Sequence, residues 1–304
     1  MNIDQLIAFD RVVREGNFSR AAWALQIAQP TVTARIQALE KSMGGLLFTR
    51  NNRVVTLTAR GASFLPFARQ ALEALQKGTH EAQQAERRGQ GELRVGVLRS
   101  LTGGLVGPIM SQFLQVHPTV RCIVQESNHW ELVEWLHDGR FEIAIVAWPP
   151  LGPQIADMTP LLHFQEPVHL LAHRNHTLAK MRTVTQADLI RLSNPFLFLR
   201  WWQATPVAIQ QLMQQATQFA DVPTDTGRYL VSNGLGVGYF NKSMMVSQMM
   251  ADDVVAIEVS DMPTIVRQSA LVRLSRNSTL SAPAKQFVEL VREQALMLEI
   301  LAER

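Results

Sequence analysis

Cysteine is almost absent from this 304-residue chain, and long apolar runs are absent altogether. The single cysteine, Cys122, excludes an internal disulfide and a cluster of metal-binding thiolates, which suits a reducing compartment. No apolar stretch approaches the ~20 residues that a membrane-spanning helix needs. The first nine residues carry Asp4 and no basic group ahead of an apolar run, so they do not resemble a signal peptide. We therefore expect a soluble protein of the cytoplasm.

The sequence motifs of several enzyme classes are also missing. There is no Gly-x-Ser-x-Gly elbow, no phosphate-binding Gly-Lys-Ser/Thr loop and no His-Glu-x-x-His pair. The four histidines between positions 163 and 176 lack carboxylate or thiol partners at ligand spacing, and a metal site needs several convergent ligands. The glycines of Gly234–Gly238 lack the preceding strand that a dinucleotide-binding loop requires. We expect no enzymatic activity, no cofactor and no metal.

Positive charge is concentrated in the first third of the chain. The net charge is only +3, but residues 1–91 hold twelve lysines and arginines against seven acids, and the remainder has a net charge of −2. Between Asn17 and Leu57, five basic residues stand against a single acid, Glu40. A basic module on a nearly neutral body indicates a polyanionic partner for that module. The charge distribution alone is equally consistent with extra arginines that only improve solubility.

Helical periodicity begins close to the N-terminus. Leu6, Phe9 and Val13 form one apolar stripe, and we predict that this helix ends at Gly16 because glycine favours the residue after a helix. Ser19 is predicted to cap a second short helix, since its hydroxyl can accept a hydrogen bond from a free backbone amide of the first turn.

A third helix is predicted between Pro30 and Gly44. Proline is tolerated in a first helical turn, and apolar residues follow at helical spacing. These residues are Val32, Ile36, Leu39 and Met43. The segment 47–57 has the pattern of a short hairpin with an asparagine-rich tip. The order of helices and hairpin is that of a winged helix-turn-helix.

The polar face of this third helix is the predicted DNA-reading surface. In the major groove, glutamine pairs with adenine, arginine pairs with guanine, and threonine contacts the thymine methyl group. The arginines of the hairpin suit contact with phosphates or with a narrow minor groove. The predicted DNA-binding residues are Ser19, Gln29, Pro30, Thr31, Thr33, Ala34, Arg35, Gln37, Arg50 and Arg53. Periodicity alone leaves open a three-helix domain that exposes a polar helix face without binding DNA.

A long amphipathic helix is predicted over residues 59–90. Thr58 is a suitable N-cap, and an apolar seam runs from Phe64 to Leu75. Pro66 interrupts this seam within the first turns, where fewer backbone donors are lost. With no domain of its own to cover the seam, the helix is predicted to form a dimer contact. The alternative is that it packs on its own chain.

Beyond Gly91 the pattern changes to strands that alternate with helices. Segments 93–98, 120–125 and 141–147 are predicted strands, and the alternation continues to a helix at 284–301. Such alternation implies parallel sheets with helices on both faces. The segment is longer than one compact sheet usually needs, so we predict two α/β subdomains.

The residues of the first 75 positions closely resemble the N-terminal region of LysR-type transcription regulators. The run Phe18-Ser19-Arg20-Ala21-Ala22 and the run Gln29-Pro30-Thr31-Val32-Thr33 match that family's helix-turn-helix. Leu46-Leu47-Phe48-Thr49-Arg50, with Leu57-Thr58 and Gly61, matches its wing and the start of its linker helix. The resemblance continues more weakly through Gly91–Val97, Asp188-Leu189 and the glycine-rich corner Val231–Gly238.

The chain departs from the family pattern at three positions. Ala28 replaces a common serine or threonine and removes a capping hydroxyl, and Ala34 occupies a position often held by arginine. Asn241 replaces a proline that is common after the glycine-rich corner. The first two departures affect which operator sequence we expect the protein to recognise, and not whether it binds DNA. The third affects only the C-terminal, sensing half.

The resemblance implies an α+β multidomain protein. Its parts would be a winged helix-turn-helix over 1–58, a linker and dimerisation helix over 59–90, and an effector-binding domain over 91–304. This domain would resemble type 2 periplasmic binding proteins, with subdomain I at about 91–166 plus 267–304 and subdomain II at about 167–266. The two crossovers would fall near Glu166-Pro167 and Val266-Arg267, with the effector in the cleft between the subdomains.

Ligands of open α/β sheets bind beyond the carboxyl ends of the strands, where helix N-termini favour anions. The predicted effector-binding residues at these ends are Arg99, Ser100, Thr102, Ser127, Asn128, Trp148, Arg200, Trp201 and Trp202. Two arginines and three tryptophans would suit an organic anion with a flat or bulky body. The tryptophans would equally suit packing in a core or interface, and Arg99 would equally pair with Glu126.

We therefore expect a ligand-responsive transcription regulator. As a homodimer or a homotetramer it would bind double-stranded DNA at an interrupted palindrome with half-sites ~10 base pairs apart. A small-molecule effector would change the footprint or bend of the DNA, and RNA polymerase would be a further partner. Two other classes remain open. One is a solute-binding protein, or an enzyme, on the same cleft fold, and the other is a sequence-tolerant nucleoid-type DNA binder.

Overall fold

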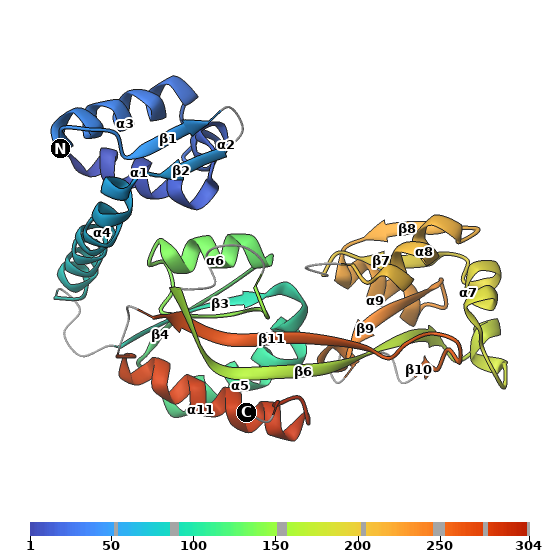
Figure 1. The fold of residues 1–304 in the computed structure, drawn as a ribbon. Helices are drawn as coiled ribbons and strands as arrows, with labels where there is room; N and C mark the ends of the chain where they lie inside the picture. Colours follow the sequence, from blue (N-terminus) through green and yellow to red (C-terminus); the bar gives the residue numbers. More distant parts are fainter. Residues whose placement is uncertain are drawn as a thin grey trace. The chain divides into compact units, whose positions relative to one another are not determined.

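The computed structural model describes residues 1–51, 54–85, 91–150, 157–201, 205–245, 253–275 and 279–302. The chain divides into two compact units, Met1–Gly89 and Gln90–Arg304 (Figure 1). Among the described helices, none combines the length and the apolar composition needed to cross a membrane.

The first unit is the predicted winged helix-turn-helix followed by a long helix. Its elements are α1 (Ile3–Glu15), α2 (Phe18–Ala24), α3 (Gln29–Met43), β1 (Phe48–Asn51), β2 (Val54–Leu57) and α4 (Ala59–Ala85). Strands β1 and β2 form an antiparallel hairpin in which Phe48 pairs with Leu57. Helices α1 and α3 end at Gly16 and Gly44, whose φ angles of 59° and 69° are left-handed and therefore favour glycine.

The N-cap of the second helix differs from the prediction. Asn17, not Ser19, caps α2, because the Oδ1 atom of Asn17 accepts hydrogen bonds from the backbone N–H groups of Ser19 at 2.8 Å and Arg20 at 3.1 Å. Ala28 precedes α3 and makes no side-chain capping bond. The third helix therefore begins without a side-chain cap.

Three aromatic rings from distant segments meet in the core of the first unit. The ring centroid of Phe9 lies 5.3 Å from that of Phe48 and 5.4 Å from that of Phe64. The wing is joined to α3 by a buried carboxylate, Glu40, whose Oε1 atom accepts hydrogen bonds from the backbone N–H groups of Leu47 and Phe48. The acid that interrupts the basic segment in sequence thus has a structural role in holding the hairpin.

The apolar seam of α4 has two parts with different surroundings. Phe64, Ala68 and Leu72 pack into the core of the first unit, as the alternative interpretation of this helix expected. Phe67, on the flank of this stripe, and Leu75, farther along the helix, are 67% and 52% exposed. The helix therefore packs on its own chain through part of its apolar seam and leaves these two residues without a described neighbour in the core.

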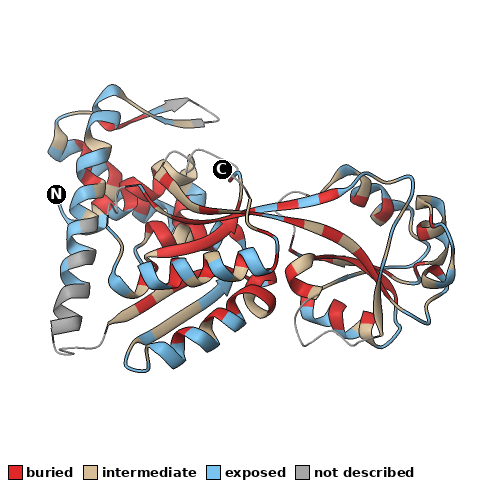
Figure 2. Ribbon diagram, turned by 90° about the horizontal axis from the view of Figure 1, so that it is seen from below, coloured by how far each residue is buried: buried red, intermediate tan, exposed pale blue. Residues whose placement is uncertain are grey.

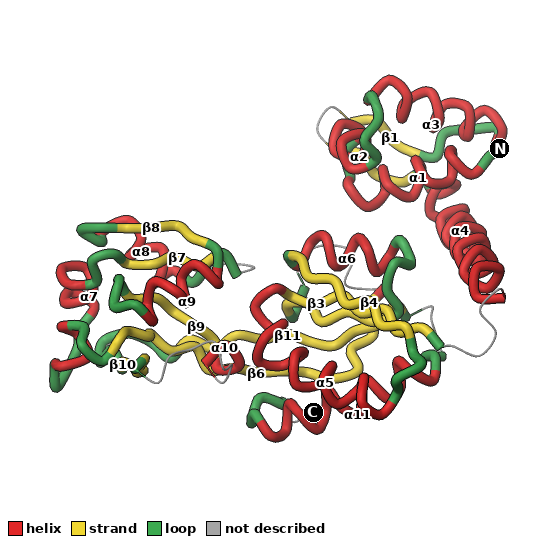
Figure 3. Tube along the Cα trace, turned by 180° about the vertical axis from the view of Figure 1, so that it is seen from behind, coloured by secondary structure: helices red, strands yellow, loops and turns green. Residues whose placement is uncertain are grey.

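The second unit is built on one hydrogen-bonded sheet that runs through two lobes (Figures 1 and 3). In its described part the strand order is β4, β3, β5, β11, β6, β9, β7, β8, with β10 paired to β6. The strands are β3 (Glu92–Leu98), β4 (Arg121–Ser127), β5 (Ile143–Ala147), β6 (Met158–His173), β7 (Phe196–Leu199), β8 (Phe219–Val222), β9 (Val237–Asn241), β10 (Val254–Ile257) and β11 (Ile265–Leu274).

Helices cover the faces of this sheet in both lobes (Figure 3). The helical elements are η1 (Arg99–Leu101), η2 (Thr102–Val106), α5 (Gly107–Val116), α6 (His129–His137), η4 (Thr177–Lys180), α7 (Gln186–Leu192), α8 (Val207–Gln215), α9 (Thr224–Ser232), α10 (Lys242–Met245) and α11 (Ala282–Met297). The buried residues lie mainly on the strands and on the inward helix faces (Figure 2). They form two separate apolar clusters, which define lobe I and lobe II.

The prediction of purely parallel sheets is wrong at the centre of this unit. Strands β3, β4 and β5 are parallel, as are β7, β8 and β9, but β6 and β11 run antiparallel to each other and to their other neighbours. Strands β6 and β11 are sixteen and ten residues long. Both long strands continue from one lobe to the other (Figure 1).

The residues predicted at the crossovers are direct neighbours in this long ladder. Glu166 pairs with Arg267, and Pro167 pairs with Val266. The two lobes are thus joined by paired strands rather than by loops. A two-lobed mixed α/β fold behind a winged helix-turn-helix agrees with the expected fold class.

Candidate nucleic-acid interface and ligand cleft

Helix α3 has one buried face and one polar face, as the apolar periodicity predicts. Val32, Ile36 and Leu39 are fully buried. The opposite face carries predicted DNA-binding residues that are exposed, namely Gln29, Pro30, Thr31, Ala34 and Gln37. Thr33 and Arg35 are partly buried beside them. A helix with this division of faces has the form needed to enter a major groove.

The side chain of Gln29 is held by its neighbour one turn along α3. Its Nε2 atom donates to the Oγ1 atom of Thr33 at 3.3 Å, and this hydroxyl donates to the backbone carbonyl of Gln29 at 3.2 Å. An amide used for base recognition benefits from such support, because fewer rotamers are lost when it binds. Thr33 therefore positions Gln29 on the polar face of the helix.

Arg35 has a partner that its position in sequence did not suggest. Its Nη2 atom lies 3.1 Å from the Oδ2 atom of Asp4 in α1. The Asp4 side chain is 56% exposed, and an exposed pair of this kind contributes at most about 1 kcal/mol. Arg35 can therefore leave Asp4 for another partner at little energetic cost.

The remaining predicted DNA-binding residues lie around this helix. Ser19 is exposed in the first turn of α2. Arg50 lies in β1 opposite Val55, but its side chain is outside the described residues, as is the whole of Arg53. The placement of the wing side chains therefore stays a prediction.

A small cavity lies where the strands of the two lobes end. Its volume is ≈ 90 Å³. It is lined by Leu98, Arg99 and Ser100 after β3, by Ser127 through Trp130 after β4, by Ala147 at the end of β5, and by Arg200 and Trp201 after β7. This cavity, which we call the cleft, brings together residues from four strand ends, as the carboxyl-end rule predicts.

The cleft contains most of the predicted effector-binding residues. Those that line it are Arg99, Ser100, Ser127, Asn128, Arg200 and Trp201. Trp202 lies outside the described residues. Two residues that were not predicted, His129 and Trp130, also line the cleft. They directly follow Asn128 at the start of α6, so the same strand-end rule, extended by two residues, would have found them.

Thr102 and Trp148 are not among the residues that line the cleft. The Oγ1 atom of Thr102 donates to the backbone carbonyl of Arg99 at 2.9 Å, so it stabilises the turn after β3. The Trp148 ring lies 5.5 Å from the His163 ring and lines a different hollow in lobe I. Side chains alternate along a strand, and Ala147 already faces the cleft, so Trp148 points elsewhere.

Both arginines of the cleft are paired with carboxylates. The Nε atom of Arg99 lies 3.3 Å from Oε1 of Glu126, the alternative partner suggested by the sequence. The Nε atom of Arg200 lies 2.7 Å from Oδ1 of Asp221. The side chains of both arginines are more than half exposed. Each guanidinium has five N–H donors, so these pairs leave donors for a ligand while they balance the positive charge.

Two buried polar atoms of the cleft have no hydrogen-bond partner in the described structure. They are the Oγ atom of Ser100 and the Nδ1 atom of His129, and both residues are only 5% exposed. Neighbouring polar groups are satisfied: Asn128 caps α6 by accepting from the N–H of Glu131 at 3.1 Å, and Ser127 hydrogen-bonds the carboxylate of Glu131. A buried polar group without a partner costs about 1–3 kcal/mol. A ligand that satisfied Ser100 and His129 would recover this energy.

Burial lowers the pKa of His129 from 6.5 to about 4. The folded protein therefore holds a neutral imidazole at pH values where the unfolded chain binds a proton. The resulting stability is present above pH 6.5 and decreases as the pH falls toward 4, by up to about 3 kcal/mol. We expect the free energy of unfolding to fall less steeply between pH 6.5 and 4 in His129→Asn than in the wild type, as measured by urea unfolding followed by circular dichroism. An equal fall in the wild type and in the variant would contradict the role assigned to His129.

Two family models match the chain in the order of its two units. The model described as "Bacterial regulatory helix-turn-helix protein, lysR family" matches residues 3–62, and the model described as "LysR substrate binding domain" matches residues 86–296. The HTH-type transcriptional regulator YnfL of Escherichia coli strain K12 is 31% identical over 268 residues, which cover 82% of this chain and 86% of YnfL.

Solved structures show the same fold over nearly the whole chain. A cysteine-to-aspartate variant of full-length OxyR from Pseudomonas aeruginosa has a TM-score of 0.52 at 22% identity, covering 97% of this chain and 99% of OxyR. Full-length CbnR in complex with its target DNA has a TM-score of 0.51 at 24% identity, covering 97% of this chain and 100% of CbnR. With both family models matched in order, the chain belongs to the LysR-type transcription regulators, which have a DNA-binding helix-turn-helix and a substrate-binding domain.

Proposed function

We propose that this regulator senses a small organic anion in the cleft and changes its binding to operator DNA in response. The observation that carries the proposal is a pair of buried polar atoms, Ser100 Oγ and His129 Nδ1, that lie beside two arginines and have no hydrogen-bond partner among the described residues. A hydroxyl and the N–H of a neutral imidazole both donate hydrogen bonds to a carboxylate. Arg99 and Arg200 add charge-assisted donors at the mouth of the cleft.

The volume of the cleft limits the size of the ligand. Its volume of ≈ 90 Å³ is smaller than the about 150 Å³ of a cavity that admits benzene. In this arrangement of the lobes, the cleft accommodates an anion of the size of acetate or pyruvate. A larger body would require the lobes to separate, and the Trp130 and Trp201 rings would then offer it flat apolar surfaces.

The first unit supplies the contact with DNA. Helix α3 enters the major groove, with Gln29, Arg35 and Gln37 reading base edges and the wing contacting phosphates. The CbnR structure, which has the same fold, contains target DNA, and this supports DNA binding by the present chain. The exposed Phe67 and Leu75 of α4 form the contact between two copies, so that a dimer, or a dimer of dimers, binds an interrupted palindrome. The protein acts on transcription together with RNA polymerase and catalyses no reaction.

Replacing Arg35 or Arg50 by alanine should weaken DNA binding in different ways. Arg35→Ala should relax the preference at one base pair by about 1–3 kcal/mol, because a bidentate contact with guanine is lost. Arg50→Ala should weaken binding to all DNA sequences to a similar degree and reduce the dependence of affinity on salt, because a phosphate contact is lost. Fluorescence anisotropy with operator DNA and with singly substituted operators measures both effects. An equal loss of discrimination in the two variants would overturn the assignment.

The anion site is tested by calorimetry on the full-length protein with acetate, pyruvate and benzoate. Ser100→Ala and Arg99→Ala should each weaken binding of the tightest-binding anion by about tenfold. Each substitution removes one hydrogen bond to a charged group, which is worth roughly 1.5 kcal/mol. Arg191→Ala is the matched control. Its side chain is 70% exposed and pairs with Asp188 in α7, outside the cleft.

The same anion should also change the footprint of the protein on its operator. Unchanged anion affinity in Ser100→Ala would remove this residue from the site. Binding of every tested anion without any change of footprint or DNA bend would contradict the regulatory role, and hydrolysis or other conversion of a bound ligand would favour an enzyme instead.

A further inference from the structure

A buried charged cluster lies where the two lobes join, outside the set of residues that line the cleft. Glu166 of β6 is fully buried, and Arg267, its paired neighbour on β11, is 7% exposed. Removing two charges from water is expensive, and a buried ion pair is weak support for stability as such. The contacts of these two side chains therefore point to a role other than stability.

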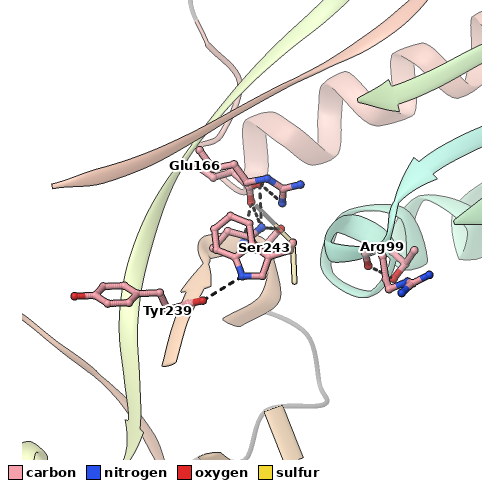
Figure 4. Close-up of polar contacts among 8 residues, drawn as sticks. Arg99, Glu166, Tyr239 and Ser243 are labelled. Atoms are coloured by element: carbon pink, nitrogen blue, oxygen red, sulfur yellow. Dashed lines mark hydrogen bonds and ion pairs between the residues drawn. The ribbon is translucent and has the colours of Figure 1, made fainter. Parts of the chain in front are cut away.

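The carboxylate of Glu166 is held firmly by lobe II. The Nδ2 atom of Asn241 lies 3.0 Å from each of its oxygens, and the backbone N–H of Ser243 donates to Oε1 at 3.0 Å. Figure 4 shows this group of contacts around Glu166 and Ser243. Asn241 supplies the side-chain N–H groups of this link, so a residue without a side-chain donor at this position would not provide it.

The guanidinium of Arg267 is held less firmly. Its Nη1 atom lies 3.9 Å from Oε2 of Glu166, and within the described residues Nη1 makes no hydrogen bond. The ring of Trp201 lies beside it, with its centroid 5.1 Å from the Arg267 Cζ atom. The pair thus has an ion contact without a hydrogen bond, and an indole beside the cation supports its burial.

Trp201 belongs both to the cleft and to this cluster. It is 9% exposed and lines the cleft next to Arg200. Its Nε1 atom donates to the backbone carbonyl of Tyr239 at 3.2 Å, the hydrogen bond drawn at Tyr239 in Figure 4. A ligand in the cleft and the cation of Arg267 therefore share one side chain.

We propose that Trp201 couples occupancy of the cleft to the junction of the lobes, where Glu166, Arg267 and Asn241 form a hinge group. A ligand that packs against the indole shifts it relative to Arg267. The guanidinium then changes between the long ion contact seen here and a hydrogen-bonded pair with Glu166. Because β6 and β11 are the strands that connect the lobes, this exchange alters the angle or the stiffness between them. The coupling rests on the proposed binding of an anion in the cleft.

The test uses hydrogen–deuterium exchange on the full-length protein without any ligand. Trp201→Leu should accelerate exchange at least about tenfold in two hinge peptides, 163–169 and 264–270, relative to peptides of β3. Trp201→Phe keeps an aromatic ring beside Arg267 and should stay near the wild-type rate. Trp130→Leu is the matched control, because Trp130 also lines the cleft and is not one of the rings beside Arg267. Wild-type exchange in Trp201→Leu, or equal acceleration in Trp130→Leu, would overturn the proposal.

A second arm adds pyruvate or acetate to the same samples. The anion should change exchange in the two hinge peptides of the wild type and of Trp201→Phe, and this response should be lost in Arg267→Met and Asn241→Ala at unchanged anion affinity. A response that persists in both variants would contradict the coupling. If neither anion binds the wild type, the proposed ligand class fails, and the ligand-free arm still decides the role of Trp201. If Trp201→Leu does not fold, Trp201→Phe and Asn241→Ala decide the outcome.

Discussion

Gly61→Ala is expected to detach the wing from the start of α4. A Cβ atom at this position would lie 2.2 Å from the backbone carbonyl oxygen of Leu47 and 2.8 Å from a methyl carbon of Leu57. A backbone oxygen cannot move aside alone, because Thr58 also donates its backbone N–H to this oxygen, at 2.9 Å. Overpacking of this kind costs about 3 kcal/mol. Native-state hydrogen exchange in α3 peptides should therefore accelerate by roughly a hundredfold.

The same helix provides a matched control for this substitution. A Cβ atom at Gly78 would meet nothing within 4 Å. Gly78→Ala should leave the first unit unchanged or stabilise it by up to about 1 kcal/mol, since alanine is the better helix former. Operator affinity should fall in Gly61→Ala and stay unchanged in Gly78→Ala. Equal exchange rates in the two variants would show that α4 does not need close contact with the wing.

Asp10→Ala is expected to have the second large effect. The Oδ2 atom of Asp10 lies 2.5 Å from Arg14, and Oδ1 accepts from the Nε atom of Arg69 in α4 at 2.9 Å. Asp10 is 4% exposed and the Arg14 side chain is 5% exposed. Removing one partner of a buried pair destabilises by about 3–5 kcal/mol, because the remaining charge loses its compensation. Thermal unfolding of the first unit and operator affinity measure this loss.

The ionisation of Asp10 adds a pH dependence to this prediction. Burial alone would raise the pKa of Asp10, but the charges and hydrogen bonds of Arg14 and Arg69 outweigh it and lower the pKa below 3.8. The contribution of the carboxylate is therefore complete above the unfolded pKa and is lost as the pH falls through the lowered pKa of the folded state. Asp4→Ala, which removes an exposed carboxylate from the same helix, should cost less than about 1 kcal/mol. A similar loss in both variants would refute the role assigned to the buried pair.

Much of the first unit follows from local sequence rules. Apolar spacing in Val32, Ile36 and Leu39 identifies the buried face of α3, and the glycines after α1 and α3 mark helix ends because left-handed backbone favours glycine. Capping was harder to predict: Asn17 and Ser19 are both good caps two residues apart, and only the backbone path selects between them. The pairing of Arg35 with Asp4 joins residues 31 positions apart, and no local pattern contains such a contact.

The cleft could be predicted in outline because it depends on topology. Parallel strands place their carboxyl ends at one edge of a sheet, so Arg99, Ser100, Asn128 and Arg200 could be grouped from strand ends alone. Trp148 illustrates the limit of this rule, since a shift of one residue along a strand reverses the direction of the side chain. Which residues follow a strand is visible in sequence, and which way they point depends on where the strand stops.

The sequence by itself determined the family, the order of the parts and the polar face of the reading helix, because these depend on short-range periodicity and on motifs at constant spacing. Only the tertiary structure decided which charges are buried. Glu40, Asp10 and Glu166 look alike in sequence, as single acids among apolar or basic neighbours. Their roles arise from partners that the fold brings to them: backbone amides of the wing, arginines of two helices, and an asparagine from a neighbouring strand. Such contacts depend on how elements pack, and burial then makes each of them energetically decisive.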